Sequence, residues 1–123
     1  MTPRLLLITL LSLGLATSSV QALENNALPT GGVVEAGSAT ITQSTQQLTV
    51  DQSSQQAILG WESFNVGVDA SVHFNHQLAN SSTLNNIHGA SGSVILGNIY
   101  SNGQLIISNP NGISFGPNST VQT

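Results

Sequence analysis

Residues 108–118 place a tight turn between two short runs of alternating apolar and polar residues. Pro110 presets φ for the first central position of a turn, Asn111 tolerates the second position, and Gly112 suits the exit. Apolar residues occupy every second position on both sides of the turn, at Leu105, Ile107, Ile113 and Phe115. Because a period of two is typical of strands, the sequence predicts a strand, a tight turn and a second strand.

The same period of two recurs along the chain in short runs bounded by Gly, Asn, Ser or Pro, which is how strands begin and end. The apolar pairs are Ala39 and Ile41, Leu48 and Val50, Val72 and Phe74, Val94 and Leu96, Leu105 and Ile107, and Ile113 and Phe115. No segment has a sustained helical stripe, although residues 53–59 are compatible with one helical turn that Gly60 would end. The pattern predicts an all-β chain.

Successive apolar runs are separated by intervals that suit two all-β architectures. Leu48 and Val72 are 24 residues apart, Val72 and Val94 are 22 apart, and Val94 and Ile113 are 19 apart. Solenoid coils have periods of roughly 20 residues or more, and the short strands of a β-sandwich would give similar intervals. Many amides and few charges favour the solenoid, because stacked amides bond to each other whereas stacked like charges repel.

The first 22 residues have the features of a signal peptide. Arg4 precedes a charge-free run over residues 5–16, which is shorter than the roughly 20 residues that span a bilayer. Val20 and Ala22 put small residues where signal peptidase reads. We expect cleavage after Ala22, which leaves residues 23–123 as one domain, and the alternative is a retained N-terminal anchor.

Charge and cysteine content exclude several classes of function. Arg4 is the only Lys or Arg, so residues 23–123 have no cationic side chain other than histidine. Such a chain does not neutralise phosphates, so we expect no binding to nucleic acid or to anionic membranes. The chain has no cysteine, so no disulfide and no thiolate is available to it.

The residues that could carry chemistry do not form a convincing catalytic or metal site. Alternation turns His73 to solvent, and neither His76 nor His88 has the further ligands that a metal needs. The segment 89–93 resembles a nucleophile elbow but has Ser93 where that motif requires Gly. The carboxylates are scattered, at Glu24, Glu35, Asp51, Glu62 and Asp69. We therefore expect no catalytic residue, no cofactor and no metal.

Trp61, Phe64 and Val66 form the densest aromatic and apolar cluster. Such a cluster packs in the core by default. Aromatic residues are also favoured anchors at interfaces, so Trp61 and Phe64 are alternatively part of a recognised surface.

Five short sequence segments, in this order after a signal peptide, resemble those of a known family. They are residues 27–32, 60–67 around Trp61, Phe64 and Asn65, 96–97, 102–105 and 109–115. The resemblance is to the two-partner-secretion, or haemagglutination-activity, domain at the N-terminus of filamentous haemagglutinin and other large exported bacterial adhesins, haemolysins and contact-dependent toxins.

The resemblance implies a right-handed parallel β-helix with N-terminal capping strands, and a secretion signal rather than an enzyme. After export by the Sec machinery and cleavage by signal peptidase, such a domain is read in the periplasm by the POTRA domains of a dedicated outer-membrane β-barrel transporter. It then seeds folding of a secreted or cell-surface passenger of a Gram-negative-type bacterium. The family's recognition and folding motif falls on Asn109, Pro110, Asn111, Gly112 and Ile113.

The chain departs from the family pattern in two respects. Nothing between His73 and Ile95 matches a second Asn-Pro-Asn-Leu motif that some members carry. Residues 119–123 read as an incoming strand, so we expect a fragment, with a solenoid that is incomplete at its C-terminus. The alternative functions are a structural adhesin module that binds a host or neighbouring cell, and an enzyme on a β-helix, which the absence of basic residues argues against.

Overall fold

The computed structural model describes residues 22–123, so most of the predicted signal peptide lies outside the described residues. Within this range all regular secondary structure is β-strand, as the alternation predicts. The strands are β1 (Val33–Ala36), β2 (Ala39–Gln43), β3 (Gln47–Gln52), β4 (Gln56–Trp61), β5 (Ser71–His76), β6 (Ser82–Ile87), β7 (Ser93–Ile95), β8 (Asn98–Ser101), β9 (Gln104–Ser108), β10 (Ile113–Phe115) and β11 (Thr120–Gln122).

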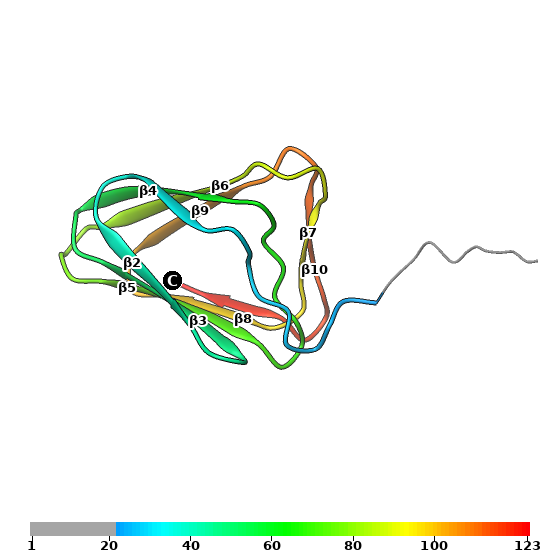
Figure 1. Cartoon of the computed structure of the whole chain (residues 1–123). Helices are drawn as coiled ribbons and strands as arrows, with labels where there is room; N and C mark the ends of the chain where they lie inside the picture. The colour runs from blue at the N-terminus through cyan, green and yellow to red at the C-terminus, as the bar shows by residue number, and fades with distance from the viewer. Residues whose placement is uncertain (1–21) are drawn as a thin grey trace, which may run out of the picture.

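The strands wind into a parallel β-solenoid whose three sheets form the sides of a triangle (Figure 1). One sheet has the order β11-β8-β5-β3-β2, the second β1-β4-β6-β9, and the third pairs β10 with β7. All pairs between successive coils are parallel and in register. The solenoid prediction is therefore confirmed, and the sandwich alternative is wrong.

The N-terminal strands close the first coil. β1 pairs with β4 and β2 pairs with β3, and these two pairings are the antiparallel ones among the strands of residues 22–123. The capping strands implied by the resemblance are thus present. At the other end the inward side chains are less covered, since Phe115 is 56% and Val121 is 44% exposed.

The interior is a series of side-chain stacks that run from coil to coil. Leu48, Val72 and Ile99 occupy matching positions of β3, β5 and β8, and all three are buried. Trp61 stacks on Ile87 in the same way at the ends of β4 and β6. Removal of these side chains from water supplies the main favourable free energy of folding.

Buried polar side chains link the coils within this core. The Trp61 indole Nε1–H donates to Asn85 Oδ1 at 2.9 Å, and Asn85 Nδ2 donates to the Ile106 carbonyl at 3.2 Å. Gln52 Nε2 donates to the Ser82 carbonyl at 2.9 Å, and its Oε1 accepts the hydroxyl proton of Thr83. The buried amides therefore bond to unlike partners across coils, not to stacked copies of themselves.

One local expectation is wrong: residues 53–59 form no helical turn, because Gln56–Trp61 is strand β4. The pair Val94 and Leu96 marks the region of strand β7, but the inward residue there is Ile95, which is fully buried, bridges to Val66 and stacks under Phe115. Within a continuous apolar run, alternation does not show which residues face inward. Here the stacking of Ile95 on Val66 determines the inward face.

No helix in the described part of the chain is long and apolar enough to cross a membrane.

Replacement of Asn85 by Ala should lower the free energy of unfolding by roughly 1–3 kcal/mol, because it leaves the Trp61 indole N–H buried without an acceptor. Urea unfolding followed by the fluorescence of Trp61, the only tryptophan, measures this change. Asn86→Ala, on the outward side of the same strand, is the matched control and should stay within about 0.5 kcal/mol of wild type. Equal losses for the two variants would contradict the role given to Asn85.

Candidate functional site

The turn of residues 109–112 stacks on the turn of the coil before it. Within the turn, Gly112 N–H donates to the Asn109 carbonyl at 3.0 Å, and Asn111 N–H donates to Asn109 Oδ1 at 2.9 Å. The second bond is the Asx contact that Asn at this position favours. Gly112 has φ of 97°, a conformation that glycine adopts without the strain of other residues.

The side-chain amides of the turn point back to the preceding coil. Asn109 Nδ2 donates to the Ser91 carbonyl at 3.1 Å and to Ser93 Oγ at 2.9 Å. Asn111 Nδ2 donates to the Gly89 carbonyl at 3.0 Å. Both asparagines thus connect one coil to the next, and the exposed surface of the turn is formed by Pro110, Asn111 and Gly112.

Ile113 leaves the turn as the first residue of β10 and is half-buried, in register with Ser93 of β7. Beside it lies a shallow hollow of about 370 Å³, lined by residues of the two stacked turns and the two strands that leave them. This hollow is the concave feature next to the predicted motif.

The aromatic motif lies in the same corner of the solenoid, two coils before the turn of residues 109–112. Trp61 and Phe64 are each 1% exposed and meet edge to face, with ring centroids 5.5 Å apart. Asn65 Oδ1 accepts the Val94 N–H at 2.8 Å, which fastens this loop to β7. Both rings therefore belong to the core, and a partner protein has no direct access to them.

Three successive corners form one column: residues 62–65, then 88–92, then 109–112. Glycines make the close stacking possible. A Cβ on Gly89 would lie 2.0 Å from the Glu62 carbonyl oxygen, and one on Gly92 would lie 2.9 Å from the Asn111 carbonyl oxygen. The two sequence-predicted motifs are thus joined through a middle corner whose residues 89–93 matched only an imperfect nucleophile elbow in the sequence. The Gly-x-x-Gly spacing of Gly89 and Gly92 was the available signal for this corner.

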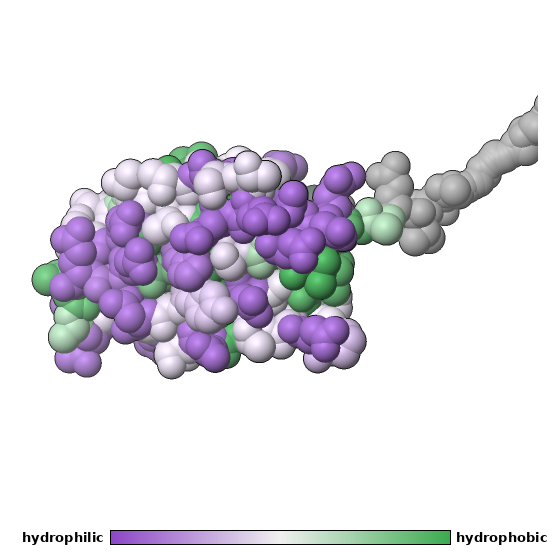
Figure 2. Space-filling view, turned by 90° about the horizontal axis from the view of Figure 1, so that it is seen from below, coloured by the Kyte–Doolittle hydropathy of each residue, from purple (hydrophilic) through white to green (hydrophobic). Residues whose placement is uncertain are grey.

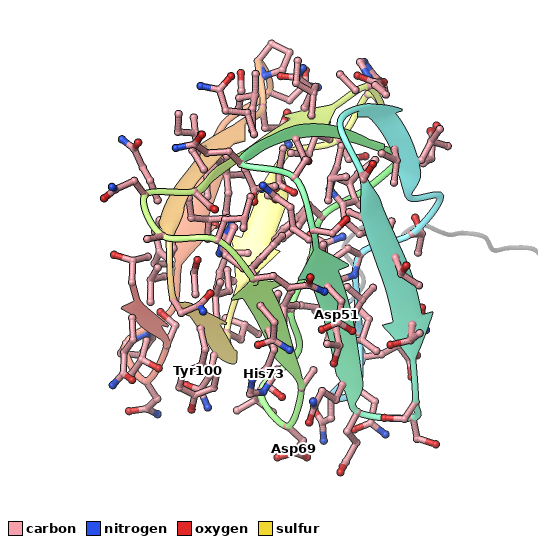
Figure 3. All side chains as sticks on the ribbon, turned by 90° about the vertical axis from the view of Figure 1, so that its left-hand side faces the viewer. Asp51, Asp69, His73 and Tyr100 are labelled. Carbon is pink, nitrogen blue, oxygen red and sulfur yellow. The ribbon has the colours of Figure 1, made fainter. Side chains whose placement is uncertain are left out.

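The other candidate residues have structural partners. His73 faces outward on β5, with its ring 4.8 Å from that of Tyr100 on the neighbouring β8 (Figure 3). His76 Nε2 lies 2.7 Å from Thr83 Oγ1 inside the solenoid, and His88 Nε2 lies 2.8 Å from Glu35 Oε2 at the surface. Among residues 22–123 no three His, Asp or Glu side chains are grouped to hold a metal ion.

Comparison with known proteins decides the family. The family model of the TPS secretion domain, where TPS is two-partner secretion, matches residues 25–123.

The chain belongs to the TPS secretion-domain family. It is 34% identical over 86 residues to a heme/hemopexin-binding protein of Haemophilus influenzae, which is 70% of this chain and 10% of that protein. A second heme/hemopexin-binding protein of that species is 32% identical over 78 residues, 63% of this chain and 8% of that protein. The chain thus spans about a tenth of the length of these relatives.

A solved structure shares the fold of this TPS domain. The crystal structure of the HMW1 secretion domain from Haemophilus influenzae superposes with a TM-score of 0.71 at 30% identity. The match covers 76% of this chain and 25% of that one. The parallel solenoid described above is therefore the architecture of a solved secretion domain of this family.

Asn109→Ala should destabilise this TPS domain more than Asn111→Ala. The first substitution removes three side-chain hydrogen bonds and should cost roughly 1–3 kcal/mol, whereas the second removes one and should cost roughly 0.5–1.5 kcal/mol. Urea unfolding of the two variants provides the measurement. A larger loss for Asn111→Ala would mean that the bonds to Ser91 and Ser93 do not hold the corner.

Proposed function

We propose that this TPS domain directs export of a longer passenger through a cognate outer-membrane β-barrel transporter whose periplasmic POTRA domains bind it. The passenger would reach the periplasm by the Sec route after signal peptidase cuts behind Ala22, and would end secreted or at the cell surface. The observation that carries the proposal is family membership over residues 25–123, together with a corner column that contains both motifs of the family resemblance.

Asn109, Asn111 and Ile113 have a positioning role in this proposal. Their contacts hold the turn on the preceding coil, so that Pro110 and Gly112 present a fixed backbone shape outward. Trp61, Phe64 and Asn65 act indirectly, because they set the position of the corner of residues 88–92, on which the turn stacks. We assign to the corner column both the shape that the transporter reads and the nucleus on which later coils stack.

We propose no catalytic role for the domain. Its five carboxylates are scattered along the sequence, and it has no Lys or Arg to bind an acidic polysaccharide. The second candidate is an adhesin function; the matched relatives are heme/hemopexin-binding proteins, which favours a passenger that binds a ligand. Because the chain spans so little of those relatives, we assign contact with host or neighbouring cells to the passenger as a whole.

The double substitution Asn109→Ala and Asn111→Ala tests the proposal in a full-length passenger expressed with its own transporter. The two substitutions together should cost roughly 1.5–4.5 kcal/mol, which is below the typical stability of 5–15 kcal/mol for a folded domain. We expect secretion into the medium to fall about tenfold or more while circular dichroism stays β-rich.

The control is Asn75→Ala, which removes a surface amide that bonds to Asp51 on another side of the solenoid. Its secretion should match that of wild type. Normal secretion of the Asn109 and Asn111 double variant would remove both residues from the export function.

A further inference from the structure

Strand β6 reverses the usual relation between hydrophobicity and burial. Thr83 and Asn85 point into the solenoid and are fully buried, whereas Leu84 between them points outward and is only half-buried. A strand with one face in a core normally places its apolar residues inside. Departures from that rule are expected where function needs them.

The reversal is fixed by buried hydrogen bonds. Thr83 donates to Gln52 and Asn85 accepts from the Trp61 indole, so both polar side chains have partners inside the core. A shift of β6 by one residue would bring Leu84 inside. It would also break these bonds and move all side chains of the strand to the opposite face of the sheet. The outward position of Leu84 is therefore specified by the fold.

Leu84 belongs to an aliphatic stripe on the outer face of the β1-β4-β6-β9 sheet. The register aligns Ile58 of β4, Leu84 of β6 and Ile106 of β9, one from each of three coils. Neighbouring members lie about 4.8 Å apart in the pairing direction, and Ile106 is 46% exposed. The stripe runs along the solenoid axis beside the corner column.

The outer face of the five-stranded sheet has the opposite character. Its aligned outward residues include Thr49 of β3, His73 of β5 and Tyr100 of β8, with Asp51 and Asn75 in the next row. The view toward this side in Figure 2 is dominated by hydrophilic residues. The aliphatic character is therefore particular to one side of the triangle.

The N-terminal end of the stripe is acidic. A hollow of about 200 Å³ lies there, lined by Val33, Glu35, Gly60, Glu62 and His88 among others. Val33 is 59% exposed, and a Cβ on Gly60 would collide with the Glu35 carboxylate. Every side-chain carboxylate of residues 23–123 lies between 24 and 69, and that segment has no Lys or Arg; the basic side chain that lines the hollow is His88, whose Nε2 lies 2.8 Å from Glu35 Oε2.

We propose that the aliphatic stripe, with the acidic hollow at its N-terminal end, is the docking surface for the periplasm-facing part of the transporter. The transporter surface would carry an apolar strip and, next to it, a Lys or Arg side chain that enters between Glu35 and Glu62. This inference rests on the proposed export function. A second copy of the chain is a poorer occupant, because it would bring carboxylates and no Lys or Arg to the hollow.

The test uses the full-length passenger expressed with its transporter. The stripe variant is Leu84→Thr with Ile106→Thr, which places threonine, a β-branched residue that suits strands, at both positions but removes outward apolar surface. Its matched control is His73→Thr with Tyr100→Thr, at aligned outward positions of the polar sheet. We expect secretion of the stripe variant to fall about tenfold or more and that of the control to stay within about twofold of wild type.

A photoreactive amino acid in place of Gln104 identifies the occupant, because Gln104 lies outward on β9, two residues from Ile106. It should cross-link to the transporter, and the same group in place of Thr49 should not. Cross-links from position 104 to another passenger copy or to a later segment of the same chain, in place of the transporter, would overturn the proposal.

Two further arms make the outcome decisive. If deletion of residues 25–123 leaves secretion unchanged, the export function itself fails; if deletion stops secretion but the stripe variant is exported like its control, only the docking surface fails. Folding is checked by protease resistance of the periplasmic passenger in cells without transporter. If the stripe variant is unfolded, the docking surface is tested instead with the double variant Glu35→Gln and Glu62→Gln. Reduced secretion of this variant supports the proposal, and wild-type secretion overturns it.

Discussion

The hydrogen bond from the Trp61 indole to Asn85 is the interaction on which the rest of the structure depends. An indole N–H inside an apolar core needs an acceptor, and Asn85 provides it from the next coil at 2.9 Å. The bond fixes β6 against β4, and the second amide proton of Asn85 continues to the Ile106 carbonyl on β9. One side chain therefore relates three coils.

This register determines the position of both surfaces that we propose for recognition, the corner column and the aliphatic stripe. With Asn85 inside, Leu84 must face outward beside Ile58 and Ile106. The same register ends β4, β6 and β9 at one corner, where the loops stack closely enough that glycine is needed at position 89. Asn109 and Asn111 can reach the carbonyls beneath them only because that spacing is held.

The sequence predicts those parts of the fold that local chemistry controls. Alternation located β2, β3, β5, β7, β9 and β10, and Pro110, Asn111 and Gly112 predicted the turn, because these features depend on neighbours along the chain. The contacts of Asn109 to Ser91 and of Asn111 to Gly89 join residues 18 and 22 positions apart, so they follow from coil stacking, which no local pattern encodes.

Two further features of the fold could not be predicted, for the same reason. Val94, Ile95 and Leu96 are all apolar, so alternation alone could not select Ile95 as the inward residue; the bridge to Val66 does. In β6 the pattern would place Leu84 inside, and only the partners of Thr83 and Asn85 in other coils reverse it. The aliphatic stripe could not be predicted from the sequence for this reason. The capping strands were implied by the family resemblance and not by the alternation of apolar residues.

Hydrogen exchange of the Trp61 indole proton, measured by NMR on nitrogen-15-labelled protein, tests the central claim most directly. The chain has one tryptophan, so the spectrum should contain one indole resonance. If the bond to Asn85 fixes the register, that proton should exchange as slowly as the most protected strand amides, which open only on global unfolding. Exchange at the rate of a solvent-exposed indole, or several indole resonances from coexisting registers, would contradict the account.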